Sequence, residues 1–183
     1  MLSKQHRQLL RSLAYDSIKH GLETGRALEI TISDFPEELQ VARATFVTLH
    51  RNRQLRGCIG ILKPVRPLAE DVAYNAWAAA FTDSRFSPLG PGELVDLDIH
   101  ISILGTPEDM HFSSEDDLVK QIRPGTDGLI LEDGFHRGTF LPSVWESLAD
   151  TREFLNHLKQ KAGLPSNHWS DTLKIKRYTV EEF

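Results

Sequence analysis

Residues 44–63, ATFVTLHRNRQLRGCIGILK, are the stretch that most restricts the fold of this chain. β-branched and aromatic side chains fill its first arm, which is typical of a β-strand. Asn52 tolerates the positive φ of a tight turn, so a two-residue loop at Asn52–Arg53 predicts a hairpin in which Val47 lies opposite Cys58. Strand alternation then predicts two faces, with Val47, Leu49, Arg56 and Cys58 on one and Phe46, Thr48, Gly57, Ile59 and Ile61 on the other. Because both faces carry apolar side chains, we expect an interior strand pair.

The remaining pattern mixes helices with antiparallel strands. Apolar residues at helical spacing predict a helix over 4–23, and an alanine-rich segment predicts a second helix over 66–81. The strict alternation of VDLDIHISIL, residues 95–104, predicts a half-buried strand. Further predicted elements are strands over 27–32 and 172–180, a hairpin within 125–142, a helix starting in 113–122 and a helix over 144–163. This order favours an α+β fold with antiparallel sheets flanked by helices.

The composition excludes several classes of protein. Apolar residues make up 40% of the 183 residues and charged residues 26%, which suits one globular domain or one domain with a small lobe. The net charge of −5 disfavours a nucleic-acid scaffold, because phosphate binding needs clustered positive charge. A single cysteine forms no internal disulfide, and no segment is typical of a signal peptide or membrane span. We therefore expect a cytoplasmic protein that binds neither nucleic acid nor membrane; its oligomeric state stays open.

Cys58 has two interpretations. It is either a small buried side chain or a reactive thiol, since free cysteine is often buried and inert. Gly57 and Gly60 would let a ligand approach the backbone closely, or they would let a helix pack near the strand. Arg56 is two residues away on the same strand, where a guanidinium would favour the thiolate. The hypothesis is that Cys58 is a nucleophile and that Arg56 promotes its ionisation.

Several motifs occur in a fixed order around and after this segment: LRGCIG, AAAFTDSRFSPL, ISILGTPEDM, GTDGLIL, GTFLPSVW and FLNHLKQKAGL. Together they resemble the AMMECR domain family, whose bacterial and archaeal members are often called AmmeMemoRadiSam system protein A. The resemblance covers nearly the whole chain, and LRGCIG is the family's hallmark. The departures are small: DSRF stands where many members have Asp-Pro-Arg-Phe, and LPSVW where many have Leu-Pro-Gln-Val.

The resemblance implies a two-lobed α+β fold. A larger lobe, residues 1–110 and 169–183, would contain both termini, and a smaller lobe, residues 111–168, would be inserted into it. Members of the family tend to occur with a Memo-like protein, which is similar to metal-dependent extradiol dioxygenases, and with a radical-SAM protein. The resemblance therefore implies a place in a pathway or complex rather than a named reaction.

Four other side chains are candidates for the site. Asp127, in GTDGLIL, is either a turn former or a carboxylate that orients or deprotonates a substrate. Arg85 either pairs with Asp83 or clamps an anionic ligand. Thr139 is a strand residue whose hydroxyl could face a ligand. His100 would act as a base only if it shares a strand face with Cys58.

Other chemistries lack their motifs. The chain has no HExxH or cysteine–histidine cluster for zinc, no P-loop lysine and no GxGxxG after a strand. One thiol cannot hold an iron–sulfur cluster, so we expect no metal and no cofactor. The leading hypothesis is a small ligand or modified residue bound in an inter-lobe cleft, with Cys58 as nucleophile and with Asp127 and Arg85 positioning the substrate. The alternative is a non-catalytic subunit that docks on a Memo-like metalloprotein.

Overall fold

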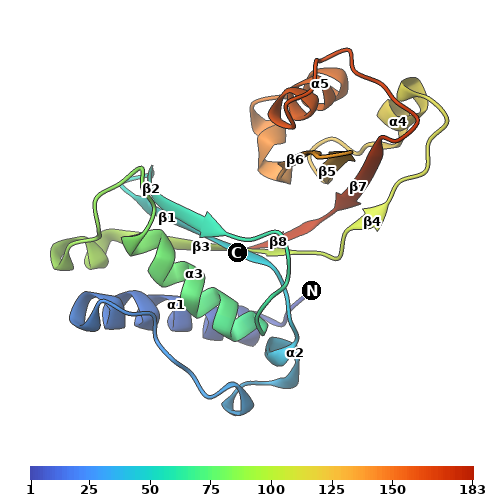
Figure 1. The fold of residues 1–183 in the computed structure, drawn as a ribbon. Helices are drawn as coiled ribbons and strands as arrows, with labels where there is room; N and C mark the ends of the chain where they lie inside the picture. The colour runs from blue at the N-terminus through green and yellow to red at the C-terminus, as the bar shows by residue number, and fades with distance from the viewer. The chain divides into compact units, whose positions relative to one another are not determined.

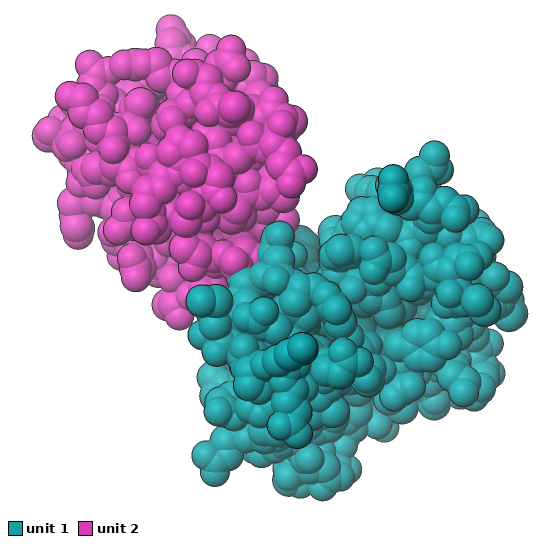
Figure 2. All heavy atoms as spheres, turned by 180° about the vertical axis from the view of Figure 1, so that it is seen from behind, with its two compact units in different colours: residues 1–104, 181–183 teal, residues 105–180 magenta.

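The computed structural model describes residues 1–183, which divide into two compact units (Figures 1 and 2). Unit 1 comprises residues 1–104 and 181–183, and unit 2 comprises residues 105–180. Each unit has its own four-stranded sheet and its own buried apolar cluster. The predicted α+β class, with a smaller part inserted into a larger one that contains both termini, is therefore confirmed. None of the helices combines the length and the apolar character needed to cross a membrane.

The sheet of unit 1 has the strand order β2-β1-β3-β8. Its strands are β1 (Thr45–Arg51), β2 (Gln54–Gly60), β3 (Leu97–Leu104) and β8 (Val180–Glu182). The helices are α1 (Lys4–Thr24), α2 (Glu37–Gln40) and α3 (Leu68–Phe81), with 3-10 turns η1 (Ile32–Asp34) and η2 (Pro91–Asp96). Helix α1 begins where the Ser3 hydroxyl accepts a hydrogen bond from the His6 amide, and it ends at Gly25, whose φ of 74° is left-handed.

The core of unit 1 lies between the sheet and the two long helices. α1 and α3 run side by side on one face of the sheet (Figure 1). Val47 and Leu49 of β1 and Ile101 of β3 point into this layer and are fully buried. Each such side chain contributes roughly 1.5–3 kcal/mol when it leaves water, so this face fixes which way every strand is turned.

The register of the hairpin differs from the predicted one. Asn52 and Arg53 form the expected two-residue turn, with φ values of 52° and 63°. A β-bulge follows between Leu49 and His50, however, and Thr48 rather than Val47 lies opposite Cys58. The prediction that Cys58 shares a face with Val47 and Leu49 is therefore wrong, because the bulge adds one residue to β2 and reverses the alternation beyond it. Cys58 points away from α1 and α3.

Unit 2 has a second antiparallel sheet, in the order β4-β7-β5-β6. Its strands are β4 (Glu108–Asp109), β5 (Gly128–Asp133), β6 (His136–Phe140) and β7 (Lys174–Tyr178). Its helices are α4 (Glu115–Gln121) and α5 (Thr151–Lys161), with a 3-10 turn, η3 (Pro142–Glu146). The ring of Trp145 stacks on that of Phe154 at 3.7 Å between centroids, inside the apolar cluster of this unit.

Three predicted elements have different bounds. Residues 27–31 form no strand. The helix predicted over 144–163 is a 3-10 turn followed by α5, because the Asp150 side chain caps α5 by accepting from the Glu153 amide at 2.9 Å. The strand predicted over 172–180 is divided into β7 and β8, which belong to different sheets.

This division also explains the bounds of the inserted unit, which are 105–180 rather than 111–168. Strand β7 pairs with β5, and β4 pairs with β7, so both flanking segments belong to the smaller sheet. Hydrogen-bonded strand pairing, which composition does not reveal, sets the boundary.

Candidate functional site

The sulfur of Cys58 lies on the face of the unit 1 sheet opposite its α-helices. Cys58, Thr48 and His100 are consecutive partners across β2, β1 and β3. The face that carries these three residues is called the Cys58 face below. The Cys58 Sγ lies 3.2 Å from the Thr48 Oγ1, and either atom can be the donor. Cys58 is half-buried.

Both the amide and the carbonyl of Cys58 are hydrogen-bonded to one ion pair, Asp83 and Arg85. Its amide donates to the Asp83 Oδ2 at 2.9 Å, and its carbonyl accepts from the Arg85 Nη2 at 3.4 Å. Arg85 also donates to both oxygens of Asp83, at 2.9 and 2.7 Å. The Arg85 guanidinium is the main reason that the pKa of Asp83 lies far below its ordinary value, and the Cys58 amide acts in the same direction. Asp83 is therefore a carboxylate that anchors the strand.

Arg56 is used differently from the prediction that paired it with the thiol. Its Nε and Nη2 donate to the two oxygens of Glu93 in η2, at 2.8 and 3.0 Å. These bonds, with that from the Gly90 amide, lower the pKa of Glu93 to about 2. The centroid of the Phe86 ring lies 5.9 Å from the Arg56 Cζ and 5.5 Å from the Arg85 Cζ. Arg85 is thus the guanidinium that contacts Cys58. Arg56 contacts Glu93, and both guanidinium groups lie near the ring of Phe86.

His100 meets the condition of sharing a face with Cys58. Thr48 of β1 lies between Cys58 of β2 and His100 of β3 in the row across the sheet, so His100 is two strands away from Cys58. The His100 Nε2 lies 2.9 Å from the Asp98 Oδ2, and the ring meets that of His50 edge-on at 5.2 Å. The hydrogen-bond partner of the sulfur is Thr48 and not His100.

The two glycines beside Cys58 have packing roles. A Cβ at Gly57 would lie 2.1 Å from the Ala79 carbonyl oxygen of α3. A Cβ at Gly60 would lie 2.3 Å from both the Phe46 ring and the Thr45 carbonyl oxygen. Gly57 therefore lets α3 pack close to the strand, as one of the two interpretations expected. Packing alone explains why both positions are glycine, without a ligand.

Asp127 and Thr139 belong to unit 2. Asp127 is fully buried and accepts from the Arg123 amide at 2.9 Å and the Arg123 Nε at 3.0 Å, while its own carbonyl accepts from the Trp145 indole at 2.7 Å. These contacts are those of a turn former before β5. The Thr139 Oγ1 is buried without a hydrogen-bond partner.

Comparison with known proteins assigns the family. The model of the AMMECR1 family matches residues 11–183. The chain belongs to the AMMECR1 family. A relative from Methanothermobacter thermautotrophicus is 37% identical over 184 residues, covering 100% of this chain and 95% of the relative. Another, from Thermotoga maritima, is 41% identical over 169 residues and covers 91% of each chain.

A solved crystal structure is also similar to this one. The crystal structure of the uncharacterized protein PH0010 from Pyrococcus horikoshii matches with a TM-score of 0.83 and 36% identity, over 95% of this chain and 88% of that chain. The resemblance found from the ordered motifs is therefore confirmed.

Two residues of the candidate site were missed by sequence reasoning. Asp83 was considered only as a partner for Arg85, and Thr48 was assigned to the opposite face. The spacing of Asp83 and Arg85, with one residue between them, indicated a local ion pair. Nothing in the sequence indicated that this pair would hold the backbone of a cysteine 25 residues earlier.

Proposed function

We propose that this AMMECR1-family chain binds a small ligand on the Cys58 face of unit 1 and that the Cys58 sulfur bonds to it as a nucleophile. The observation that carries the proposal is the clamp on the Cys58 backbone. Asp83 and Arg85 hold the amide and the carbonyl of the residue, while its sulfur lies on the face opposite the α-helices. A nucleophile needs a fixed direction of attack, and a rigid strand with both peptide groups bonded supplies one.

The proposed step is a substitution at an electrophilic carbon. The Cys58 thiol gives its proton to solvent, and the thiolate forms a carbon–sulfur bond. The bond to the leaving group breaks, and the electron pair stays on that group. The Thr48 hydroxyl, 3.2 Å away, can donate to the thiolate before the attack.

Arg85 suggests the charge of the ligand. Its side chain is 55% exposed, and its bonds to Asp83 use only Nε and Nη2. Nη1 thus stays available to an anionic group beside the sulfur. The proposed ligand therefore combines an electrophilic carbon with a negative charge.

Alkylation of the native chain tests both parts of the proposal. Iodoacetamide and iodoacetate form the same bond to sulfur and release iodide, but only iodoacetate is anionic. We expect mass spectrometry to show that Cys58 is modified before unfolding. The ratio of the iodoacetate rate to the iodoacetamide rate should be higher for Cys58 than for free cysteine. Arg85→Gln should lower this preference by roughly threefold, the effect of one partly screened charge. Modification only after unfolding would exclude the nucleophile.

Two matched cysteines separate exposure from the clamp. Ile59→Cys in a Cys58→Ser background places a thiol on the helix-covered face, where it should stay protected until unfolding. Ser102→Cys in the same background lies on the Cys58 face, opposite Phe46 and beside the Glu182 carboxylate rather than a guanidinium. That thiol should react but show no preference for iodoacetate. An equal preference for iodoacetate at Cys58 and at the residue 102 thiol would contradict an anion-binding site beside Cys58.

A second function, a non-catalytic accessory subunit, is favoured by a different observation. Gly57 has a packing role, and both nearby guanidinium groups are paired with carboxylates. In this role the chain would act in the cytoplasm with a Memo-like metalloprotein and a radical-SAM protein. Copurification with the Memo-like protein, with full complementation of a deletion strain by Cys58→Ala, would favour the accessory role. Loss of complementation by a folded Cys58→Ala chain would favour the nucleophile.

A further inference from the structure

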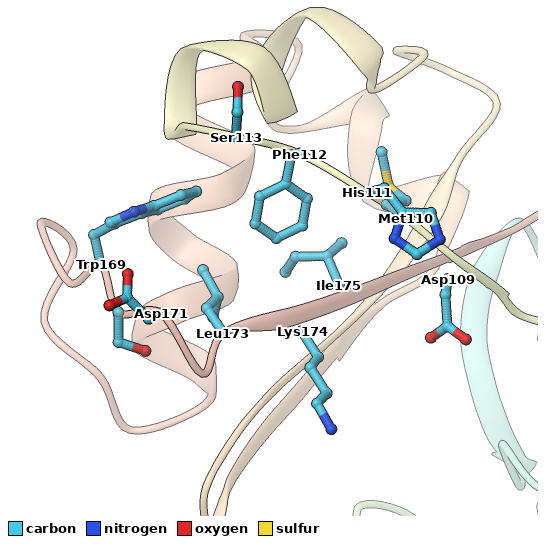
Figure 3. Close-up of a pocket in the computed structure, with 11 residues that line it drawn as sticks. Asp109, Met110, His111, Phe112, Ser113, Trp169, Asp171, Leu173, Lys174 and Ile175 are labelled. Carbon is cyan, nitrogen blue, oxygen red and sulfur yellow. The ribbon is translucent and has the colours of Figure 1, made fainter.

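Unit 2 contains a pocket that includes none of the residues discussed so far as site candidates. It has a volume of about 550 Å³ and lies between residues 109–113 and 169–175 (Figure 3). Strands β4 and β7 pair next to it, where the Met110 amide donates to the Ile175 carbonyl at 2.9 Å. This size is within the roughly 300–1,000 Å³ of small-molecule sites.

The inner wall of the pocket is apolar and aromatic. Leu173 and Ile175 are 6% and 1% exposed and belong to the core of unit 2. The rings of Phe112 and Trp169 lie 5.5 Å apart at an angle of 59°. Trp169 remains 37% exposed although it borders this core. The exposed indole offers a ligand a flat π surface.

The loop that carries Trp169 is held from behind by Asp133. His168, Ser170 and Thr172 each place a side-chain atom 2.6–2.7 Å from an oxygen of this carboxylate. The hydrogen bond from Thr172, followed by those from Ser170 and His168, lowers the pKa of Asp133 to about 2. Trp169 and Asp171 lie between these three residues in the sequence, and both line the pocket. The indole and the Asp171 carboxylate are thereby fixed in place before any ligand binds.

The charges around the pocket favour a cation. Asp171 lies beside Trp169, whereas the Lys174 side chain points away from the Phe112 ring (Figure 3). The carboxylate of Asp109 is already paired with Lys176 at 3.3 Å. Asp171 forms no such ion pair, so its charge is available to a ligand. A cation over an indole face gains further from the ring quadrupole.

We propose that this pocket binds small alkylammonium ions, with the cationic group against the Trp169 indole and the Asp171 carboxylate. Phe112, Leu173 and Ile175 take the apolar part of the ligand. The site is separate from the Cys58 face in its residues and its chemistry, and it does not depend on the function proposed there.

An NMR titration of the full chain with two isosteres tests the proposal. The probes are choline and 3,3-dimethyl-1-butanol, in which carbon replaces the charged nitrogen. The indole signal of Trp169 is assigned by its loss in Trp169→Phe. Choline should shift this signal saturably, with an affinity roughly tenfold above that of the alcohol, as expected for one cation–π contact and one ion pair.

Two carboxylate variants then locate the charge effect. Asp171→Asn should weaken choline about two- to fivefold and leave the alcohol unchanged, because it removes one ion pair. Asp109→Asn is the matched control, since that carboxylate is already paired with Lys176, and it should change neither affinity. Equal binding of choline and the alcohol would overturn recognition of the charge. Absence of a saturable shift with choline would overturn the site itself.

Discussion

The Cys58 face of unit 1 and the pocket of unit 2 use their charges in opposite ways. Beside Cys58 each guanidinium meets a carboxylate, Arg85 with Asp83 and Arg56 with Glu93. In unit 2 the Asp133 carboxylate holds the Trp169 loop but does not line the pocket, whereas Asp171 lines the pocket and forms no ion pair. Charges near Cys58 therefore hold the backbone, so changing them should cost stability as well as reactivity. In unit 2 Asp133 supports the loop and Asp171 is left to bind a ligand, so the two roles can be separated by substitution.

The largest effect is expected where the Cys58 hairpin meets α3. Gly57→Ala would place a methyl group 2.1 Å from the Ala79 carbonyl oxygen, which belongs to the helix backbone and cannot turn aside. The helix must move or the strand must shift, and we expect the free energy of unfolding to fall by about 3 kcal/mol. Urea denaturation, monitored by circular dichroism, measures this change.

Gly92→Ala is the matched control for that substitution. A Cβ at Gly92 meets nothing within 4 Å, so the free energy of unfolding should change by less than about 0.5 kcal/mol. If Gly57→Ala were equally mild, the helix would not hold the strand that carries Cys58.

The next largest effect is expected at Asp83. Asp83→Asn removes the charge that Arg85 faces and leaves one oxygen to accept from both the Cys58 amide and the guanidinium. Asp83 is 6% exposed, and we expect a loss of about 2 kcal/mol in the free energy of unfolding. The preference of Cys58 for iodoacetate should change with it, because Arg85 loses its partner. A stable variant with unchanged alkylation would show that the clamp does not position the thiol.

The pH dependence of this effect has a defined sign. Folding lowers the pKa of Asp83, so its contribution to stability is complete above the pKa of an unfolded aspartate, about 4, and is lost as pH falls below it. The difference between the wild type and Asp83→Asn should therefore narrow in acid. Urea titrations at pH 7 and near pH 3 measure this narrowing, and a gap that widened in acid would contradict an ionised Asp83.

Sequence reasoning predicted the long helices and the three long strands of unit 1 but not the face of Cys58. The turn at Asn52–Arg53 and the strand over 95–104 follow from local chemistry, since positive φ and strict alternation are properties of a few neighbouring residues. The bulge beside His50 accompanies the close approach of Gly57 to Ala79 of α3, which is a contact between distant segments. One added residue in a strand reverses every assignment beyond it.

The candidate sites were predicted unequally for a similar reason. Cys58 and Arg85 carry chemistry that is recognisable in isolation, so both were named and both lie at one site. The pocket of unit 2 depends on a loop held by Asp133, and its key groups, Trp169 and Asp171, look like ordinary loop residues. No local pattern distinguished Asp127, a carboxylate that its own turn uses completely, from one that is free to bind.

A smaller effect is expected from Asp133→Asn, which tests the support behind the pocket. The amide can still accept from some of its donors, so we expect a loss of roughly 1 kcal/mol at pH 7. The folded pKa of about 2 lies below that of an unfolded aspartate. The contribution is therefore complete above about pH 4 and is lost as pH falls toward 2. Thermal unfolding at pH 7 and pH 3 measures it. A constant difference between the two proteins would contradict the assigned charge.

The smallest effect on stability is expected from Asp171→Asn, and it separates the two regions most sharply. Asp171 is exposed and has no ion pair, so its loss should change the free energy of unfolding by less than about 0.5 kcal/mol while weakening choline. Asp83→Asn should show the reverse pattern, with reduced stability and unchanged choline binding. Urea denaturation and the choline titration, run on both variants, give four values. If Asp171→Asn lost as much stability as Asp83→Asn, its carboxylate would have a structural partner and would not be available to a ligand.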